Sequence, residues 1–328
     1  MENKEWNYGI DIMKILSAFM IVFYHFGHRE YEFYNAAKYI PNINYIAQTL
    51  VAFSIPLFFM VNGALLLNKT YSKKSIYFKI FKLIFIILFW NFIRFPDWFL
   101  KTLIILYLIY PVLKKILDKF PRLLILIIGI FIIFPDLYNF VISILKFFMI
   151  NNFNVLEKNI EIKIFPRTGF FTMYSIPLFL LGGIFLRKNV KIKKYQGILL
   201  VLIGLSECLF EAISITRYSE NLFDSGNGNF PTIGALLMAT GIFLILNNIN
   251  IEKRFEKVIS FLGKNVFSVY LFHMALIRII NYLFIYFNTN KILPLYINII
   301  ISIGVYLLAT IIGEIISKVP YLKETIKI

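Results

Sequence analysis

Long apolar segments alternate with short polar and basic stretches along almost the whole chain. Most segments approach the roughly 20 residues that a helix needs to cross the hydrocarbon core of a bilayer. In lipid an isolated segment can pair its backbone polar groups internally only as a helix, so strands are not expected. The pattern predicts ten helices, over residues 8–28, 45–67, 76–95, 98–117, 122–142, 169–187, 196–214, 230–248, 263–287 and 293–316.

Composition indicates that these helices lie in a membrane. The 328 residues are 59% hydrophobic and only 16% charged, and the mean hydropathy is +0.75. A soluble domain of this size could not bury so much apolar surface. We therefore predict an all-α, polytopic transmembrane helix bundle that forms one domain over residues 1–328, with the lipid bilayer as its main partner.

The positions of the charges predict orientation and exclude nucleic acid as a partner. The net charge is +16, but the basic residues lie in the connections between apolar segments. Every second connection is rich in Lys and Arg, and the connections between these are poorer, which marks the basic side as cytoplasmic. Ten spans then place both termini in the cytoplasm, in a multi-pass protein of the cell membrane. The single cysteine, Cys208, cannot form an internal disulfide.

The segment 8–28 carries more polar chemistry than its neighbours. Lys14 and His25 are eleven residues apart. Three helical turns bring them onto nearly the same face, about 16 Å apart along the axis. Asp11 lies one turn before Lys14 and can pair with it. Ionisable groups inside a membrane are costly and usually face a protein interior or a water-filled cavity. The alternative is that Lys14 snorkels to the interface and His25 only packs.

Two further places combine polar and aromatic groups. Tyr270 and His273 are three residues apart, so they share one face of the helix predicted over 263–287. Tyr270 and His273 could bind substrate, or they could only pack in the helix bundle. Trp98 could likewise bind substrate or be an interfacial aromatic residue.

Three carboxylates stand near the outer ends of apolar segments, and the histidine count is low. Asp136 follows Pro135, and Glu207 and Glu211 are one turn apart. Paired carboxylates can carry out acid–base chemistry, although near a membrane surface they are more often solvated. With three histidines and no Cys/His spacing, we expect no metal site.

Five stretches in order resemble acyltransferase family 3, whose integral membrane enzymes O-acylate surface polysaccharides and related glycans. They cover most of the chain and include the basic residue, ten-residue gap and histidine of the family, at Lys14 and His25. The five are DIMKILSAFMIVFYHF in the first segment, SIPLFFMVNGALLL at 54–67, the pair Lys79 and Lys82, WFLKTLIILYLIYPVL at 98–113 and FLGKNVFSVYLFHMAL at 261–276.

The chain departs from the family pattern at several positions. Lys14 stands where Arg is common, and lysine keeps the charge without the bidentate fork. Asn62 and Ala64 replace the usual Ser and Tyr, and Met274 replaces the proline after the histidine. The histidines on which the chemistry would depend are retained.

The resemblance implies a role for each candidate in catalysis and donor binding. His25 would be the general base, or would carry the acyl group transiently. Lys14 with Asp11 would hold part of the acyl-CoA or stabilise developing negative charge. Lys79 and Lys82 would bind CoA phosphates, although positive-inside charge alone also accounts for them.

The resemblance also implies a reaction and an acceptor site. Tyr270, His273 and Trp98 would contact the acceptor. The reaction would move an acyl group, expected to be acetyl from acetyl-CoA, to a hydroxyl of a cell-surface glycan or its lipid-linked precursor, with no bound cofactor. The buried ionisable groups also suit a transporter of a polar solute or glycan, or a membrane sensor without turnover.

Overall fold

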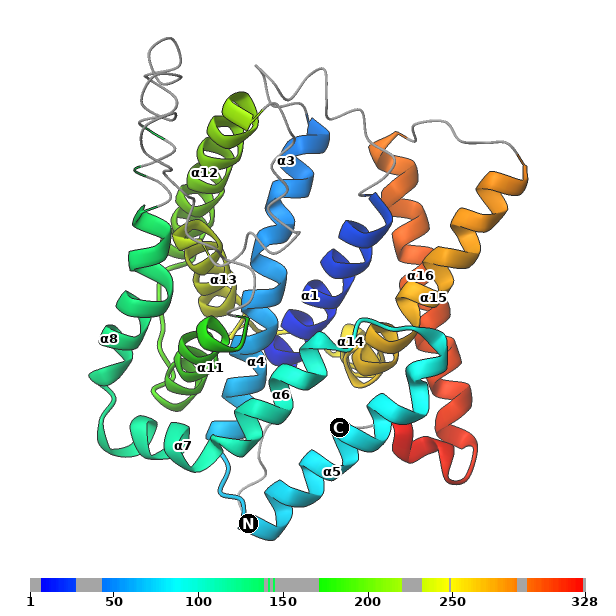
Figure 1. Cartoon of the computed structure of the whole chain (residues 1–328), viewed down its shortest axis with the longest axis horizontal. Helices are drawn as coiled ribbons and strands as arrows, with labels where there is room; N and C mark the ends of the chain where they lie inside the picture. Colours follow the sequence, from blue (N-terminus) through cyan, green and yellow to red (C-terminus); the bar gives the residue numbers. More distant parts are fainter. Residues whose placement is uncertain are drawn as a thin grey trace, which may run out of the picture.

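A computed structural model describes residues 7–27, 43–138, 141, 144, 171–219, 232–247, 249–287 and 294–326. Every regular element in these ranges is helical, which confirms the all-α prediction (Figure 1). A helix occupies each of the ten predicted ranges. Five described helices are long and apolar enough to cross a membrane: Tyr8–Phe26, Ile46–Leu67, Lys73–Ile93, Val266–Tyr286 and Leu295–Lys318. Four further apolar helices are shorter, at 10–17 residues.

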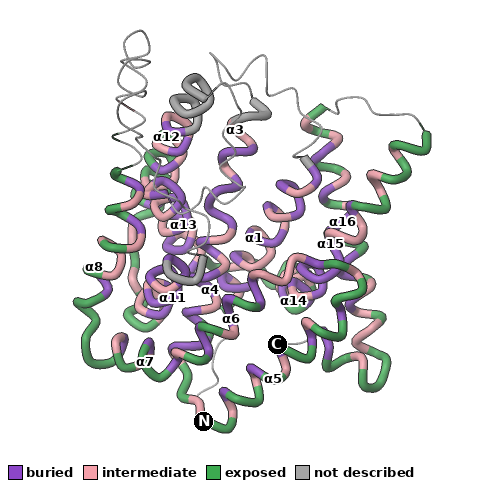
Figure 2. The backbone as a smooth tube through the Cα atoms, viewed as in Figure 1, coloured by how far each residue is buried: buried purple, intermediate pink, exposed green. Residues whose placement is uncertain are grey.

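Helix α1 (Tyr8–Gly27) is at the centre of the bundle. It packs against α4 (Ser54–Leu67), α13 (Ile233–Leu246), α14 (Lys253–Lys264), α15 (Val266–Tyr286) and α16 (Leu295–Lys318). Figure 2 shows buried residues concentrated on α1 and on α4 with the preceding α3 (Ile43–Leu50), and exposed residues along the outer helices. Side chains on α1 therefore face protein.

Glycines allow two helix pairs to approach closely. A Cβ built on Gly63 of α4 would lie 1.8 Å from the carbonyl oxygen of Phe179 on α11 (Phe171–Arg187). A Cβ on Gly182 of α11 would lie 1.9 Å from the carbonyl oxygen of Met60. Small residues at such contacts are typical of membrane helix pairs. Helix α12 (Lys194–Ser219) packs against α13 in the same way.

The region predicted as spans three and four forms a tilted helical hairpin. Helix α5 (Lys73–Trp90) and the short η2 (Asn91–Ile93) lead to a turn, and α6 (Trp98–Leu108) runs back. Figure 1 shows this turn about halfway up the molecule, well below the upper ends of α3, α12 and α16. The turn therefore does not reach the level of the upper helix ends.

Two predicted helices are each divided in the structure. The range 98–117 was expected to be one helix, but α6 ends at Leu108 and α7 (Tyr110–Lys119) begins after Ile109. Pro111 explains the break, because proline lacks an N–H and clashes with the carbonyl four residues earlier. The range 263–287 spans the end of α14 and the whole of α15, which are separated at Asn265. The remaining elements are η1 (Val51–Phe53), α8 (Leu123–Ile128), the π-helix η3 (Gly129–Ile133) and η4 (Leu322–Ile326).

Candidate active site

The charged pair on α1 is formed as the sequence predicts. Lys14 Nζ lies 2.5 Å from Asp11 Oδ1, and Asp11 is buried. Helix α14 covers the carboxylate through Gly263, where a Cβ would lie 2.6 Å from the Cβ of Asp11. The pair keeps the buried carboxylate compensated, while the Lys14 side chain stays partly accessible, at 22%.

A cavity of about 470 Å³ opens beside Lys14. This volume is within the usual range for small-molecule sites, about 300–1,000 Å³. Four lysines line the cavity and make it positive, and most of the other lining residues are apolar or aromatic. The lining consists of Lys14, Phe58, Val61, Asn62, Leu65, Leu66, Lys69, Tyr71, Lys79, Phe99, Leu103, Tyr107, Gly263, Lys264, Asn265, Val266, Phe267, Tyr270, Ser317 and Ile326.

The two lysines proposed for CoA phosphates have different surroundings. Lys79 lines the large cavity, and its Nζ lies 5.1 Å from the centre of the Tyr71 ring. Burial raises the pKa of the Tyr71 hydroxyl, and the nearby Tyr110 adds to the rise, so Tyr71 remains a protonated donor. Lys82 instead pairs with Glu324 at 2.9 Å. Both lysines line a second pocket, of about 300 Å³.

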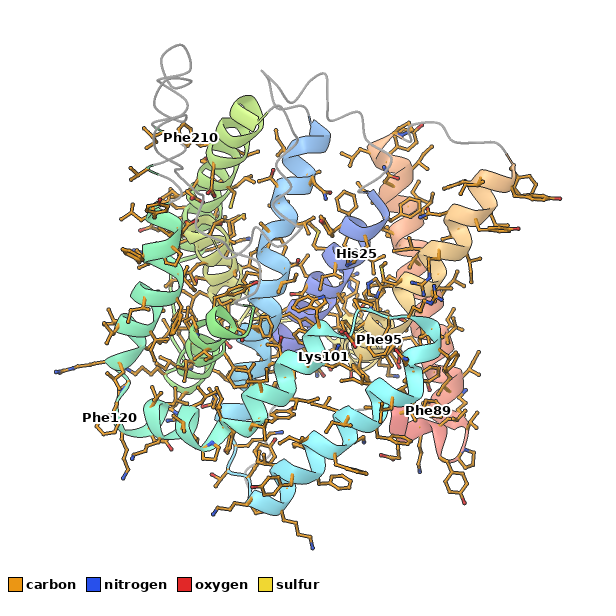
Figure 3. The ribbon with its side chains drawn as sticks, viewed as in Figure 1. His25, Phe89, Phe95, Lys101, Phe120 and Phe210 are labelled. Atoms are coloured by element: carbon orange, nitrogen blue, oxygen red, sulfur yellow. The ribbon has the colours of Figure 1, made fainter. Side chains whose placement is uncertain are left out.

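His25 faces a separate, smaller pocket of about 30 Å³. Its walls come from α1, α4, α6, α15 and the α5–α6 turn, and Trp98 of α6 is among them. The lining consists of Ile21, His25, Ile55, Phe58, Pro96, Trp98, Phe99 and Tyr270. Phe58, Phe99 and Tyr270 also line the large cavity, so these three side chains separate the lysines from the histidine. Figure 3 shows His25 in the interior, with Phe95 of the turn below it.

His273 lies next to His25 and is held in one tautomer. The two ring centres are 5.4 Å apart. Nδ1 of His273 is 3.0 Å from the Val269 carbonyl oxygen and 2.8 Å from that of Tyr270. These contacts require a proton on Nδ1, so Nε2 is the acceptor. His273 is fully buried, and within the described residues its Nε2 has no hydrogen-bond partner.

Tyr270 and Arg278 hold the α5–α6 turn against α15. The Tyr270 hydroxyl donates to the carbonyl oxygen of Pro96, and Arg278 donates to those of Ile93 and Arg94. Irregular backbone at membrane depth persists only where its polar groups are paired by protein or line a cavity. These bonds place Pro96 in the wall of the His25 pocket.

Sequence reasoning missed several residues that line the two cavities. Lys69, Tyr71 and Lys264 were not singled out, nor were Phe58 and Phe99, which separate the two cavities. Phe58, Phe99 and Lys264 lie inside the three quoted motifs at 54–67, 98–113 and 261–276. Their position in those motifs was the available signal.

The carboxylates Asp136, Glu207 and Glu211 form a second buried polar cluster. One oxygen of each lies within 4.8 Å of the others. Oδ2 of Asp136 accepts from the backbone N–H of Ile233 at 2.5 Å, and Oε2 of Glu207 accepts from that of Gly234 at 2.9 Å. The cluster therefore binds the N-terminus of α13, where the helix dipole favours negative charge.

The apolar helices are those of a membrane protein, and the lysine-lined cavity is its candidate ligand site. A model of the acyltransferase domain of acyltransferase family 3 matches residues 7–97 and 86–316. The chain therefore belongs to this family and is a membrane acyltransferase, as the motifs indicated. No curated protein and no solved structure matches the chain. The roles of individual site residues stay predictions.

Proposed function

We propose that the protein is an O-acyltransferase that moves an acetyl group from acetyl-CoA to a hydroxyl of a cell-surface glycan or its lipid-linked precursor. One observation carries the proposal. The lysine-lined cavity and the His25 pocket adjoin, and only Phe58, Phe99 and Tyr270 line both. A single donor that carries phosphates at one end and a small acyl group at the other needs these two environments side by side.

The large cavity suits the CoA part of the donor. Lys69, Lys79 and Lys264 line it together with Lys14. Ammonium groups bind phosphate through charge-assisted hydrogen bonds. A volume of about 30 Å³ at His25 corresponds to about two water-sized groups, which supports acetyl over a long acyl chain.

The chemical step uses His25 as the base. A neutral imidazole nitrogen takes the proton of the acceptor hydroxyl, and the hydroxyl oxygen forms a bond to the thioester carbonyl carbon. The carbon–sulfur bond then breaks, the proton passes to the departing thiolate, and the products are CoA and the ester. The alternative role, acyl carrier, would leave an acylated His25 when acceptor is withheld.

We propose ten crossings of the cell membrane, with both termini in the cytoplasm. The alternation of Lys-rich and Lys-poor connections supports this orientation. The α5–α6 hairpin affects only the count. If its turn stays inside the bilayer, two crossings are lost together and both termini remain on one side.

Acyl transfer in isolated membranes tests the function. Membranes containing the protein receive radiolabelled acetyl-CoA and the host's glycan and lipid-linked glycan fractions. Label should enter glycan with wild type and not with His25→Ala, when both proteins are present in equal amounts. Lys257→Gln is the matched control, because this exposed lysine of α14 lines neither cavity. Retention of transfer by His25→Ala would refute the role of His25. Absence of transfer by wild type, together with donor-independent flux of glycan in vesicles, would favour a transporter.

A further inference from the structure

A groove of about 390 Å³ lies on the surface between the end of α5 and the middle of α15. It is distinct from both cavities described above and shares no lining residue with them. The lining residues are Phe92, Ile93, Arg94, Ala275, Arg278, Ile279 and Tyr282. The groove therefore contains two arginines, and all its other side chains are apolar or aromatic.

Both arginines are exposed within an apolar surface. Phe92, Ile279 and Tyr282 are 71%, 56% and 68% exposed, as expected of side chains that contact lipid. Cations on such a surface are costly unless an anion is present. No carboxylate lines the groove, and Asp97 of the same turn is already paired with Lys101 at 2.8 Å.

Backbone carbonyl oxygens fix the Arg278 guanidinium at the groove, while the Arg94 guanidinium stays open. Arg278 donates to the carbonyl oxygens of Ile93 and Arg94, so α15 and the turn are joined there. Arg94 ends η2 with φ of 48°. Within the described residues the Arg94 guanidinium makes no hydrogen bond or ion pair, and its donors are available to a ligand.

We propose that this groove binds the phosphate or diphosphate group of a lipid carrier with a long apolar chain, the carrier of the glycan acceptor. Arginine matches phosphate oxygens bidentately, and the exposed Phe92, Ile279 and Tyr282 match the chain. The proposal rests on the proposed function, since it states which form of acceptor the enzyme uses.

The position of the groove suits delivery of a sugar to the site. Arg278 follows His273 by five residues on α15, about 7.5 Å along the axis. The segment from η2 through the turn to the first residue of α6 lines the groove with Phe92–Arg94 and the His25 pocket with Pro96 and Trp98. A carrier phosphate at Arg94 and Arg278 therefore leaves the first sugars beside the turn, next to the pocket.

Direct binding tests the proposal with farnesyl diphosphate, a short polyprenyl diphosphate. The purified full chain in phosphatidylcholine nanodiscs should bind this probe at least about tenfold more tightly than farnesol or inorganic pyrophosphate. Arg94→Gln should weaken binding at least tenfold, and Arg278→Lys should weaken it less. Arg254→Gln is the control, because Arg254 is exposed on α14 and lines no described cavity.

Three outcomes would overturn the assignment. Equal binding of farnesol would show that the arginines contribute nothing. Equal binding of pyrophosphate would show a free phosphate site. Displacement of the probe by phosphatidylglycerol at equal concentration would show a general anionic-lipid site.

The binding measurement needs no acyl donor, so it can fail independently of the proposed function. If wild type binds the probe but transfers no acetyl group, the function fails and the groove stands. If wild type acetylates lipid-free glycan and Arg94→Gln leaves the KM for the lipid-linked acceptor unchanged, the groove fails and the function stands.

Discussion

Two partly buried polar clusters in the described part of the chain differ in what their polar atoms face. At α13, Asp136 and Glu207 accept hydrogen bonds from backbone N–H groups of the helix they cap. Around α1 and α15, His25 faces a pocket, and Lys14 faces a cavity. The first cluster is directed at the protein's own backbone and the second at open space.

What a polar side chain faces therefore distinguishes a structural role from a chemical role better than its residue type does. Sequence patterns made His25 the candidate base, and residue type alone left the carboxylates as a second, less favoured option for acid–base work. A carboxylate that already accepts from a helix N-terminus is stabilised as an anion and is a poor proton carrier. A histidine at a pocket wall can exchange a proton with a ligand. The clusters should therefore respond oppositely to substitution.

Removing the pocket histidine gives the largest expected effect. We expect His25→Ala to lower acyl transfer about 10²–10⁴-fold, the usual contribution of a general base. The melting temperature in detergent should stay near that of wild type, since only the side chain at a pocket wall is lost. If His25→Ala instead lowered the melting temperature strongly and left acyl transfer unchanged, His25 would have a structural role like that of the carboxylates.

Removing a capping carboxylate should give the reverse result. Glu207→Ala leaves the Gly234 N–H without its acceptor, which costs about 1–3 kcal/mol of unfolding free energy. Thermal unfolding in detergent measures the loss, and activity is expressed per folded molecule. We expect that specific activity to match wild type. Loss of activity without loss of stability would place the cluster in the chemistry.

Tyr270→Phe tests how the turn is positioned. The substitution keeps the ring between the two cavities and removes the hydroxyl that donates to the Pro96 carbonyl. We expect kcat to fall about tenfold, for about 1.4 kcal/mol, with the KM for acetyl-CoA unchanged, because the pocket wall shifts while the lysines remain. A tenfold rise in the KM for acetyl-CoA with kcat unchanged would instead show that Tyr270 acts in donor binding.

Lys79 and Lys82 should differ in their effect on the donor. Lys79→Gln should raise the KM for acetyl-CoA about five- to tenfold, because Lys79 lines the large cavity. Lys82→Gln should raise it less, since Lys82 is engaged by Glu324. Initial rates at varied acetyl-CoA give both values, with Lys257→Gln as control. Equal effects would mean that the donor displaces Glu324.

The smallest expected effect lies at Asp118 on α7. Partial burial tends to raise the pKa of Asp118, but the hydrogen bond from Arg187 and the charge of Lys114 outweigh it and lower the pKa. The ion pair thus stabilises the protein at pH above the unfolded-state pKa of Asp118. This stabilisation is lost as the pH falls through the lower, folded-state pKa. Asp118→Asn should cost less than about 1 kcal/mol at neutral pH. The difference in melting temperature should vanish in acid.

Helical periodicity was enough to predict the parts of the site that lie on one helix. Asp11 and Lys14 pair as expected, and Tyr270 and His273 share a face with ring centres 6.3 Å apart. The helix break at Ile109 could also have been read from Pro111. These features depend on neighbours within one or two turns.

Contacts between distant segments could not be predicted in this way. The bond from Tyr270 to Pro96 joins residues 174 apart, and Lys82 meets Glu324 across 242 positions. Such pairs depend on how helices pack, which no local pattern contains. The same holds for the separation of the lysine cavity from the His25 pocket, because its three aromatic side chains come from α4, α6 and α15.

The glycine contact between α4 and α11 restricts how the active site can open. Sliding either helix by one residue would bring a side chain against the backbone that now meets Gly63 or Gly182. That wall is mechanically stiff, and α4 supplies Ile55 and Phe58 to the His25 pocket. In the proposed reaction, a sugar larger than the pocket would have to displace the opposite wall, formed by the α5–α6 turn and α15. We therefore expect the sugar to enter sideways from the bilayer rather than along the bundle axis.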